Sequence, residues 1–477
     1  MANIEAMLAE AVGHPLPPPL KDPGLEGRVQ AAVAAANQVI VALDDDPTGV
    51  QTVHDVPVIT GWDEAALAAE MARREHLFFV LTNSRSLPAA EASELSRQIA
   101  ERLRRAAAEA GRGLAIVSRS DSTLRGHFPA ETDALAAALG GVDGVLLCPA
   151  FFEGGRVTVD DTHFVVEAGR VGFAADTEFA RDATFGYRAR TLPAWVEEKS
   201  GERIPASRVA SITLEDIRIG GADRVANVLM RVRGGQPVIL NALNYADLWA
   251  AVLGILRAEA AGKRFLYRGA ASLVRARAGV AARPLLSRDE LLPHPVPTRP
   301  RGLVIVGSHV QRSSEQLSRL LTLPGVTATE VRVPELLASG VRREAELARA
   351  AAEIHDSLVK HETPVVFTSR TVERPPGVPE LDVARSVSAA LVELVRGLRV
   401  RPDFVIGKGG ITSSDVGARG LGARRAVVLG QVWPGVPVWR IGEEGLFPGL
   451  SYVVFPGNVG APDTLREMVA DLLTGNT

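Results

Sequence analysis

The chain has 477 residues, of which 46% are hydrophobic and 23% charged, and its formal net charge is −3. That length suffices for two or three domains with their own cores. The small net charge argues against a general attraction to nucleic acid or to an anionic membrane, and no apolar run approaches the roughly 18 residues of a membrane-spanning helix. The single cysteine, Cys148, excludes an internal disulfide framework and favours the reducing cytoplasm.

Residues 1–24 form a polar N-terminal arm that ends in a run of prolines and is not typical of a signal peptide. Beyond it, alanine-rich helical stretches alternate with short apolar runs. Four of these runs predict buried parallel strands: 39–43, 77–81, 114–117 and 144–150. Cys148 lies in the last run and is expected to be buried. The alternation predicts a Rossmann-like α/β domain with a mostly parallel sheet over residues 25–290.

Polar side chains follow these predicted strands at the point where each one ends. In an open parallel sheet, ligands bind beyond the carboxyl ends of the strands, so side chains from several strand ends are expected to share one site. The candidates with carboxylate, guanidinium, amide or glycine character are Asp44, Asp45, Asp46, Asn83, Arg85, Arg119, Asp121, Arg125 and Gly126.

Four prolines within residues 293–300 predict a linker at 291–301, and strand–helix alternation resumes beyond it. Residues 302–477 are therefore expected to form a second Rossmann-like α/β domain. Its predicted strand ends carry glycines, hydroxyls, one lysine and one amide instead of acids: Ser308, Ser369, Gly407, Lys408, Gly409, Gly410, Thr412, Gly457 and Asn458.

The stretch GKGGITSSD at 407–415 has two interpretations. Its glycines allow close approach of the backbone to a ligand, and their N–H groups can bind phosphate, with Lys408 adding a charge. The stretch can equally be a glycine-rich turn between a strand and a helix, since it contains no P-loop and no G-x-G-x-x-G pattern.

The acids and arginines of the first half and the glycines and hydroxyls of the second suit phosphoryl transfer from ATP. That reaction needs Mg²⁺, backbone donors around the phosphates and a carboxylate for the acceptor hydroxyl. Asp45 and Asp121 are the candidate bases, and arginines suit a substrate carboxylate.

Two other functions fit parts of the sequence. The run VIVALDDDPT also matches the D-x-D-x-T pattern of haloacid-dehalogenase-type phosphatases, with Asp44 as nucleophile and Asp46 as acid. Against it, the only later pair of acids that resembles the expected one is Asp160 and Asp161, without a convincing lysine, and the second half would have no role. A non-enzymatic sensing module would leave the Asp/Arg clusters unexplained.

From about residue 39 to the C-terminus the chain resembles the four-carbon acid sugar kinase family, formerly a domain of unknown function, in its long form. The motifs that carry this resemblance are DDDPTGVQTVHDV, LTNSRSL, SRSDSTLRGHFPAET, PAFFEGGRVT, TEFARDATFGY, WVEEKSG, GSHV, TSR, KGGITSSDV, GQVWPGVPVW and FPGNVG.

The resemblance implies a transferase that uses ATP and Mg²⁺ to phosphorylate a terminal hydroxyl of a sugar acid such as a threonate, an erythronate or a 3-oxo-tetronate. It implies an N-terminal sugar-acid domain, a C-terminal nucleotide domain and an active-site cleft between them. The family's D-D-x-T-G falls on Asp45, Asp46, Thr48 and Gly49, and its nucleotide contacts fall on Ser308, on Gly407 to Gly410 and on Gly457. A homodimer is the expected assembly, acting in carbohydrate metabolism.

Overall fold

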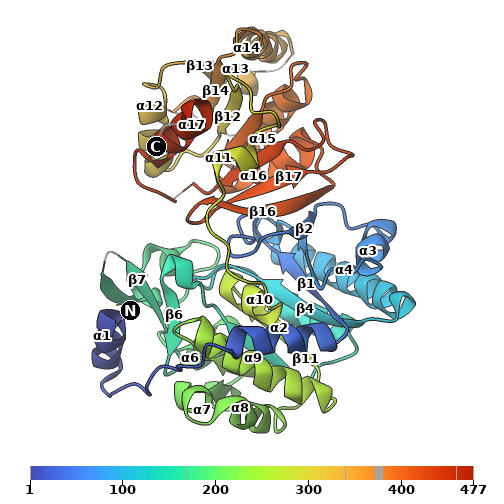
Figure 1. Ribbon diagram of the computed structural model, residues 1–477, viewed down its shortest axis with the longest axis vertical. Coiled ribbons are helices and arrows are strands. Elements are labelled where there is room, and N and C mark those ends of the chain that lie inside the picture. The colour runs from blue at the N-terminus through green and yellow to red at the C-terminus, as the bar shows by residue number, and fades with distance from the viewer. Residues whose placement is uncertain (1, 168, 339, 371–379, 458, 476–477) are drawn as a thin grey trace. The chain divides into compact units, whose positions relative to one another are not determined.

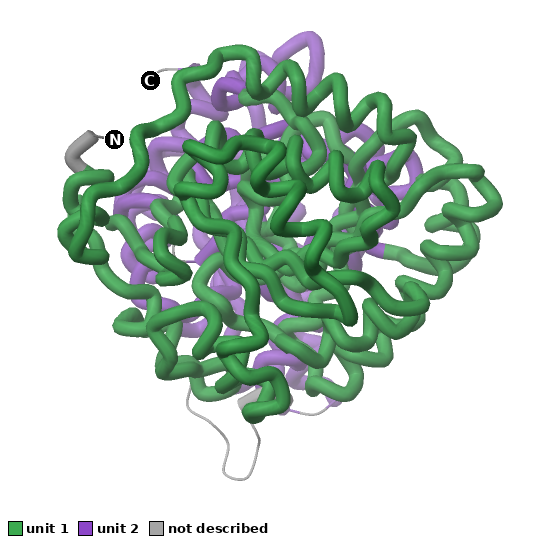
Figure 2. The backbone as a smooth tube through the Cα atoms, turned by 90° about the horizontal axis from the view of Figure 1, so that it is seen from below, with its two compact units in different colours: residues 1–56, 61–282 green, residues 57–60, 283–477 purple. Residues whose placement is uncertain are grey.

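A computed structural model describes all residues except 1, 168, 339, 371–379, 458 and 476–477. The chain forms two compact units, and the predicted α/β class with mostly parallel sheets is confirmed. Unit 1 comprises residues 1–56 and 61–282, and unit 2 comprises residues 57–60 and 283–477 (Figure 2).

The sheet of unit 1 has seven strands among the described residues, and every neighbouring pair is parallel. Their order is β3 (Leu77–Leu81), β1 (Gln38–Asp44), β4 (Gly113–Arg119), β11 (Phe265–Gly269), β5 (Gly144–Cys148), β10 (Gln236–Leu240) and β9 (Ala210–Ile212). Most of these strand residues are buried, as expected for a sheet covered on both faces. The predicted burial of Cys148 is confirmed, since its side chain is 0% exposed.

Helices connect the parallel strands of unit 1 (Figure 1). They are α2 (Leu25–Ala35), α3 (Glu64–Met71), α4 (Ala89–Ala110), α5 (Ala130–Ala138), α6 (Leu192–Lys199), α7 (Leu214–Arg218), α8 (Gly221–Leu229), α9 (Tyr245–Ala260) and α10 (Ala271–Arg277). Helix α4 shows why they form, because Ile99 and Leu103 repeat on its buried face. It ends where Gly111 takes the left-handed conformation, φ 64°.

A small antiparallel sheet belongs to unit 1 as well. It consists of β6 (Arg156–Val159), β7 (Thr162–Glu167) and β8 (Arg170–Phe173). The predicted N-terminal arm contains helix α1 (Ala2–Val12), whose Leu8 is buried in one apolar cluster with Val157 and Phe164.

The sheet of unit 2 is parallel at one end and antiparallel at the other. The parallel strands are β13 (Val326–Val331), β14 (Thr363–Thr368), β12 (Gly302–Val306), β15 (Phe404–Lys408) and β18 (Ser451–Phe455). The order continues with β17 (Val436–Ile441), β16 (Arg425–Trp433) and then β2 (Val56–Ile59). Its helices are α11 (Arg288–Leu291), α12 (Gln311–Leu320), α13 (Val333–Leu337), α14 (Val341–Val359), α15 (Glu380–Arg396), α16 (Gly410–Asp415) and α17 (Thr464–Thr474).

Strand register brings the polar strand ends of each unit together. In unit 1, Asp44 at the end of β1 lies opposite Leu81 of β3 and Arg119 of β4. In unit 2, Lys408 at the end of β15 lies opposite Val306 of β12 and Phe455 of β18. The residues that follow these strands therefore emerge at one edge of their sheet, where ligands of parallel sheets bind.

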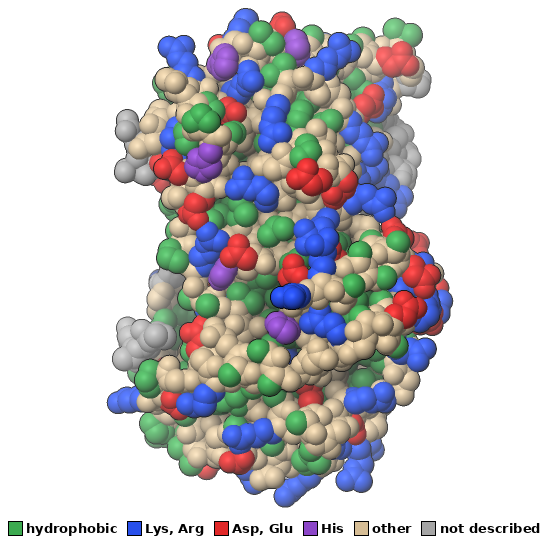
Figure 3. All heavy atoms as spheres, turned by 45° about the vertical axis from the view of Figure 1, so that its right-hand side comes forward, with side chains coloured by type: hydrophobic (Ala, Val, Ile, Leu, Met, Phe, Trp, Pro, Cys, Tyr) green, Lys and Arg blue, Asp and Glu red, His purple; other side chains and the backbone are tan. Residues whose placement is uncertain are grey.

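Acidic and basic side chains are interspersed on the face that Figure 3 shows, and neither sign forms a continuous field there. This distribution is consistent with the small net charge. Within the described part of the chain, no helix combines the length and the apolar character that crossing a bilayer would require.

Candidate active site

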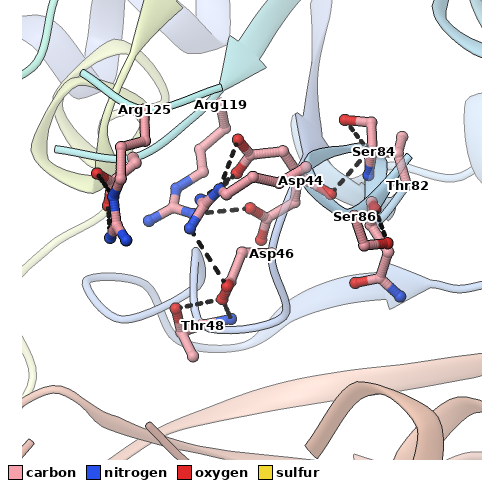
Figure 4. Close-up of polar contacts among 12 residues, drawn as sticks. Asp44, Asp46, Thr48, Thr82, Ser84, Ser86, Arg119 and Arg125 are labelled. Atoms are coloured by element: carbon pink, nitrogen blue, oxygen red, sulfur yellow. Dashed lines mark hydrogen bonds and ion pairs between the residues drawn. The ribbon is translucent and has the colours of Figure 1, made fainter. Parts of the chain in front are cut away.

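Three consecutive aspartates begin at the last residue of strand β1, and two arginines from the neighbouring strand ends bind them. Arg119 Nη1 donates to Asp44 Oδ1 at 3.0 Å and lies 3.7 Å from Asp45 Oδ1. Arg85 binds Asp45 through both carboxylate oxygens, from Nη2 at 2.6 Å and from Nε at 3.2 Å. The carboxyl-end cluster that the sequence predicts is thus formed, and part of it is drawn in Figure 4.

Asp46 is the most exposed of the three aspartates. Its side chain is 21% exposed, compared with 3% for Asp45. The tight turn after β1 explains its position, because Asp46 Oδ1 accepts hydrogen bonds from the Thr48 backbone N–H at 2.9 Å and from Thr48 Oγ1 at 2.5 Å. Its other oxygen lies 3.4 Å from Arg85 Nη1 and faces the site.

The loop after β4 adds a second carboxylate–guanidinium pair. Arg125 binds Asp121 from Nε at 2.9 Å and from Nη2 at 3.2 Å, and its guanidinium lies 4.8 Å from the ring centre of Phe179. Gly126 follows with φ 121°, and a Cβ there would lie 2.7 Å from Arg268 Nη2 and 3.1 Å from Asp45 Oδ2. The absence of a side chain at Gly126 therefore leaves the space that the side chains of Asp45 and Arg268 occupy.

The aspartates of this cluster differ in the direction of their pKa shifts. Burial raises the pKa of Asp44 to about 7, against the pull of Arg119, and burial also raises the pKa of Asp45. Although burial opposes it, Arg85 keeps the pKa of Asp46 and of Asp121 below their usual range. A general base works best when its pKa is near the working pH, so Asp45 suits that role better than Asp121.

Glu131 and Arg268 extend the cluster, and neither stood out as a firm candidate in the sequence. Arg268 Nη1 donates to Glu131 Oε2 and to Ser118 Oγ, both at 2.8 Å, and Ser84 Oγ donates to Glu131 Oε1 at 2.5 Å. All four side chains are buried. Glu131 is on helix α5 in an alanine-rich stretch, where an acid usually faces solvent, so only its three-dimensional neighbours reveal it.

The remaining candidate residues of unit 1 differ in backbone conformation and in exposure. Asn83 has φ 50°, which asparagine tolerates better than most residues, and it starts the turn Ser84–Ser86 after β3. Arg119 is only 5% exposed and is enclosed by Asp44 and Asp45, so in this arrangement it holds the aspartates. Arg85 and Arg125, 18% and 24% exposed, are the more accessible guanidiniums.

Asp44 does not suit the alternative phosphatase mechanism. A nucleophilic carboxylate must reach the phosphorus of the substrate. The Asp44 side chain is 2% exposed, its Oδ1 is bound by Arg119, and a Cβ on Gly49 would lie 2.1 Å from the same oxygen. The geometry therefore argues against the nucleophile role for Asp44.

In unit 2, Ser308 lies at the centre of the predicted nucleotide residues. It follows strand β12, and its hydroxyl accepts a hydrogen bond from Ser313 Oγ at 3.0 Å. A Cβ on Gly409 would lie 2.8 Å from Ser308 Cβ, and one on Gly457 would lie 3.1 Å from Ser308 Oγ. The ends of β12, β15 and β18 thus meet around one serine.

Glycine is required at two further positions of this site. Tyr452 Oη would lie 2.1 Å from a Cβ on Gly407, and Tyr452 donates from there to the Ser413 carbonyl at 2.7 Å. Thr412 Oγ1 would lie 2.2 Å from a Cβ on Gly307. Gly410 begins helix α16, directly after the glycine at φ 113°.

Two other predicted nucleotide-binding residues make hydrogen bonds to other parts of the protein. Lys408 is 0% exposed, and its Nζ donates to the carbonyls of Pro456 at 2.8 Å and Gly457 at 3.1 Å. Ser369 Oγ accepts from the Val333 backbone N–H at 3.1 Å, which caps helix α13. Asn458 lies outside the described residues.

These residues fit a nucleotide with its Mg²⁺. Gly409 and Gly457 bring the backbone of two strand ends directly against Ser308, and glycine backbone that is not covered by a side chain can bind phosphate through its N–H groups. The described residues contain no group of three or more His, Cys, Asp or Glu side chains placed for a metal. Mg²⁺ in phosphoryl-transfer sites is held by phosphate oxygens, waters and one or two carboxylates, so such a group is not needed.

Two family profiles match this chain. A family profile described as a sugar-binding N-terminal domain matches residues 40–277, and one described as a nucleotide-binding C-terminal domain matches residues 303–465. The chain belongs to the four-carbon acid sugar kinase family. The resemblance that the sequence motifs indicated is thereby confirmed.

A curated relative and two solved structures complete the comparison with this family. A D-threonate kinase from Bordetella bronchiseptica is 38% identical over 120 residues, which span 24% of this chain and 28% of that protein. A Salmonella typhimurium LT2 protein, provisionally described as a tRNA synthase, superposes with a TM-score of 0.65 at 18% identity, covering 91% of this chain and 98% of the other. A Haemophilus influenzae protein of the DUF1537 family gives 0.61 at 20% identity, covering 91% and 100%. These two structures show the shared fold.

Proposed function

We propose that the chain is an ATP-dependent kinase that phosphorylates a terminal hydroxyl of a four-carbon or related branched sugar acid. Threonate, erythronate and 3-oxo-tetronate are the candidate acceptors. The observation that carries the proposal is the bidentate Arg85–Asp45 pair at the strand ends of the sugar-binding domain. It combines a guanidinium for the substrate carboxylate with a carboxylate for the hydroxyl proton. The partial match to a D-threonate kinase supports the same class of acceptor.

Substrate binding frees the base in this proposal. Arg85 occupies both oxygens of Asp45 before substrate arrives. A sugar-acid carboxylate competes for the same planar fork, because guanidinium binds any carboxylate bidentately. Once Arg85 turns to the substrate, Asp45 can accept the proton of the terminal hydroxyl, and Asp121 is the second candidate for that step. Asp46, Asn83, Arg125 and Gly126 complete the acceptor site.

In this proposal, unit 2 binds ATP, the phosphoryl donor. When bound there, ATP with Mg²⁺ supplies the phosphoryl group and neutralises its charge. The chain contributes Ser308, the loop from Gly407 to Gly410, Thr412 and Gly457, and Gly409 and Gly457 pack directly against Ser308. The predicted interdomain cleft, the domain limits, the cytoplasmic location and the homodimer stay predictions.

A kinase screen tests the proposal. The purified chain is incubated with ATP and Mg²⁺ and a panel of four-carbon and branched sugar acids, and ADP release is followed. We expect at least one sugar acid to raise ADP release well above the rate without acceptor. Phosphate release from phosphate esters in the absence of ATP would instead support the phosphatase alternative.

A further inference from the structure

Arg370 follows strand β14 in unit 2, and its side chain reaches the neighbouring strand end where Ser308 sits. Nη2 donates to the Ser308 carbonyl at 2.6 Å and to Ser314 Oγ at 2.7 Å. These two bonds fix the guanidinium beside the residue around which Gly409 and Gly457 pack. Arg370 is therefore held at the nucleotide site of unit 2 by one of its three nitrogens.

The other two nitrogens of Arg370 are buried without a partner. Nε and Nη1 are inaccessible to solvent and make no hydrogen bond. Among the residues that the structure describes, no carboxylate forms an ion pair with Arg370. Burial lowers the pKa of Arg370, yet a guanidinium stays protonated in proteins, so the charge remains. Arg370 is half-buried, and buried N–H donors without an acceptor are unfavourable, which indicates that an anion completes this site.

Lys408 differs from Arg370, because its side-chain nitrogen already has acceptors in the protein. It was the cation expected to bind phosphate, but its Nζ already donates to the carbonyls of Pro456 and Gly457 and lies 4.2 Å from the ring centre of Phe455. Arg312, on helix α12, donates to the Gly460 carbonyl at 2.9 Å. Of these three cations, Arg370 is the one with buried donors, Nε and Nη1, that have no acceptor among the described residues.

We propose that Arg370 binds a phosphate of the nucleotide through Nη1, and that Lys408 instead positions the loop that carries Gly457. This inference rests on the proposed nucleotide-binding role of unit 2. Nη2 is fixed by Ser308 and Ser314, so Nη1 has a set direction, and a guanidinium N–H to a phosphate oxygen is a charge-assisted hydrogen bond. No bond to the phosphorus is formed or broken by this contact.

Calorimetric titration of the full chain with ATP and with adenosine tests the assignment. We expect Arg370→Gln to weaken ATP binding at least tenfold and to change adenosine binding less than twofold. Arg370→Lys keeps the charge but loses the fixed direction of the guanidinium N–H groups, so its affinity for ATP should lie between the two. Equal ATP affinity in Arg370→Gln and the wild type would overturn the assignment.

Thermal unfolding without ligand separates a ligand contact from a structural role. Because Arg370 has no counter-charge, Arg370→Gln should unfold within about 2 °C of the wild type or above it. Arg332→Gln is the matched control, since Arg332 follows the adjacent strand β13 and binds Glu346 from Nη2 at 2.5 Å and from Nε at 2.9 Å. That variant should lower the unfolding temperature and leave ATP affinity unchanged. A large loss of stability in Arg370→Gln with equal losses for ATP and adenosine would also overturn the inference.

Binding and turnover distinguish this inference from the proposed reaction. If the wild type binds ATP, Arg370→Gln does not, and no sugar acid is phosphorylated, the Arg370 assignment stands and the kinase proposal fails. If the wild type phosphorylates a sugar acid and Arg370→Gln binds ATP equally well, the kinase proposal stands and the assignment fails. A wild type that binds no ATP contradicts both.

Discussion

Gly409 lies against Ser308 so closely that a Cβ on the glycine would come within 2.8 Å of the serine Cβ. The glycine also has φ 113°, which side chains rarely adopt. We therefore expect Gly409→Ala to displace Ser308 and to weaken ATP binding at least tenfold, with sugar-acid binding unchanged, as measured by calorimetry.

Gly325→Ala controls for backbone strain in that experiment. Gly325 belongs to the same unit, has φ 81° and is surrounded by open space. An alanine there should cost about 1 kcal/mol of stability, as at other positive-φ sites, and leave ATP affinity unaltered. If both variants lost ATP affinity equally, strain and not crowding at Ser308 would be the cause.

Asp45→Asn should abolish turnover while leaving ATP affinity nearly intact. The substitution keeps the shape of the side chain, but an amide cannot accept the hydroxyl proton, and loss of general-base catalysis typically costs a factor of about 10²–10⁴. Steady-state kinetics and calorimetry on the same preparation measure both quantities. Asp121→Asn is the companion variant, and full activity of Asp45→Asn would move the base assignment to Asp121.

Lys408 should make stability depend on pH. Burial, with help from Arg312, lowers the pKa of Lys408 to about 7 in the folded state, against about 10.5 in an unfolded chain. Between these values the folded state binds fewer protons than the unfolded state, so stability rises with pH through this window. The neutral amine also has two N–H donors, which match the two carbonyls it contacts.

The measurement is the free energy of unfolding of the wild type and of Lys408→Met at pH 7 and pH 9. The wild type should gain roughly 2 kcal/mol relative to the variant over this interval. Groups that titrate elsewhere cancel in the difference. A difference that stays constant with pH, or shrinks, would mean that Lys408 remains charged in the fold.

Glu131→Gln should destabilise unit 1 by about 3 kcal/mol, because it removes the buried counter-charge of Arg268. Denaturant unfolding measures the loss. Asp223→Asn is the control, since Asp223 pairs with Arg257 on the surface and is 87% exposed, and it should have no measurable effect. Similar stability of the two variants would show that the Arg268–Glu131 pair contributes little.

The sequence was sufficient to predict the strand-end clusters but not the direction of each side chain. The acids and arginines after β1, β3 and β4 gather because parallel strands in register end at the same edge, and register follows from the apolar pattern. Lys408 was expected to face the ligand. As the last residue of β15 it turns instead toward the end of β18, and nothing in GKGG indicates which side of the sheet it takes.

Arg370 and Glu131 illustrate what a single sequence cannot show. A lone arginine after a strand, or a lone glutamate in an alanine-rich helix, is normally a solvated residue. Both acquire meaning from neighbours that are distant in sequence: Ser308 is 62 residues from Arg370, and Arg268 is 137 residues from Glu131. Burial and missing partners are three-dimensional properties, so the structure was needed to find them.

Transfer of label from ATP tests the central claim most directly. The chain is incubated with Mg²⁺, a threonate- or erythronate-type acid and ATP labelled in the γ-phosphoryl group, and the products are separated. The kinase proposal predicts label on the terminal hydroxyl of the sugar acid, in an amount equal to the ADP formed. Label found only in inorganic phosphate, whichever acid of the panel is supplied, would contradict it.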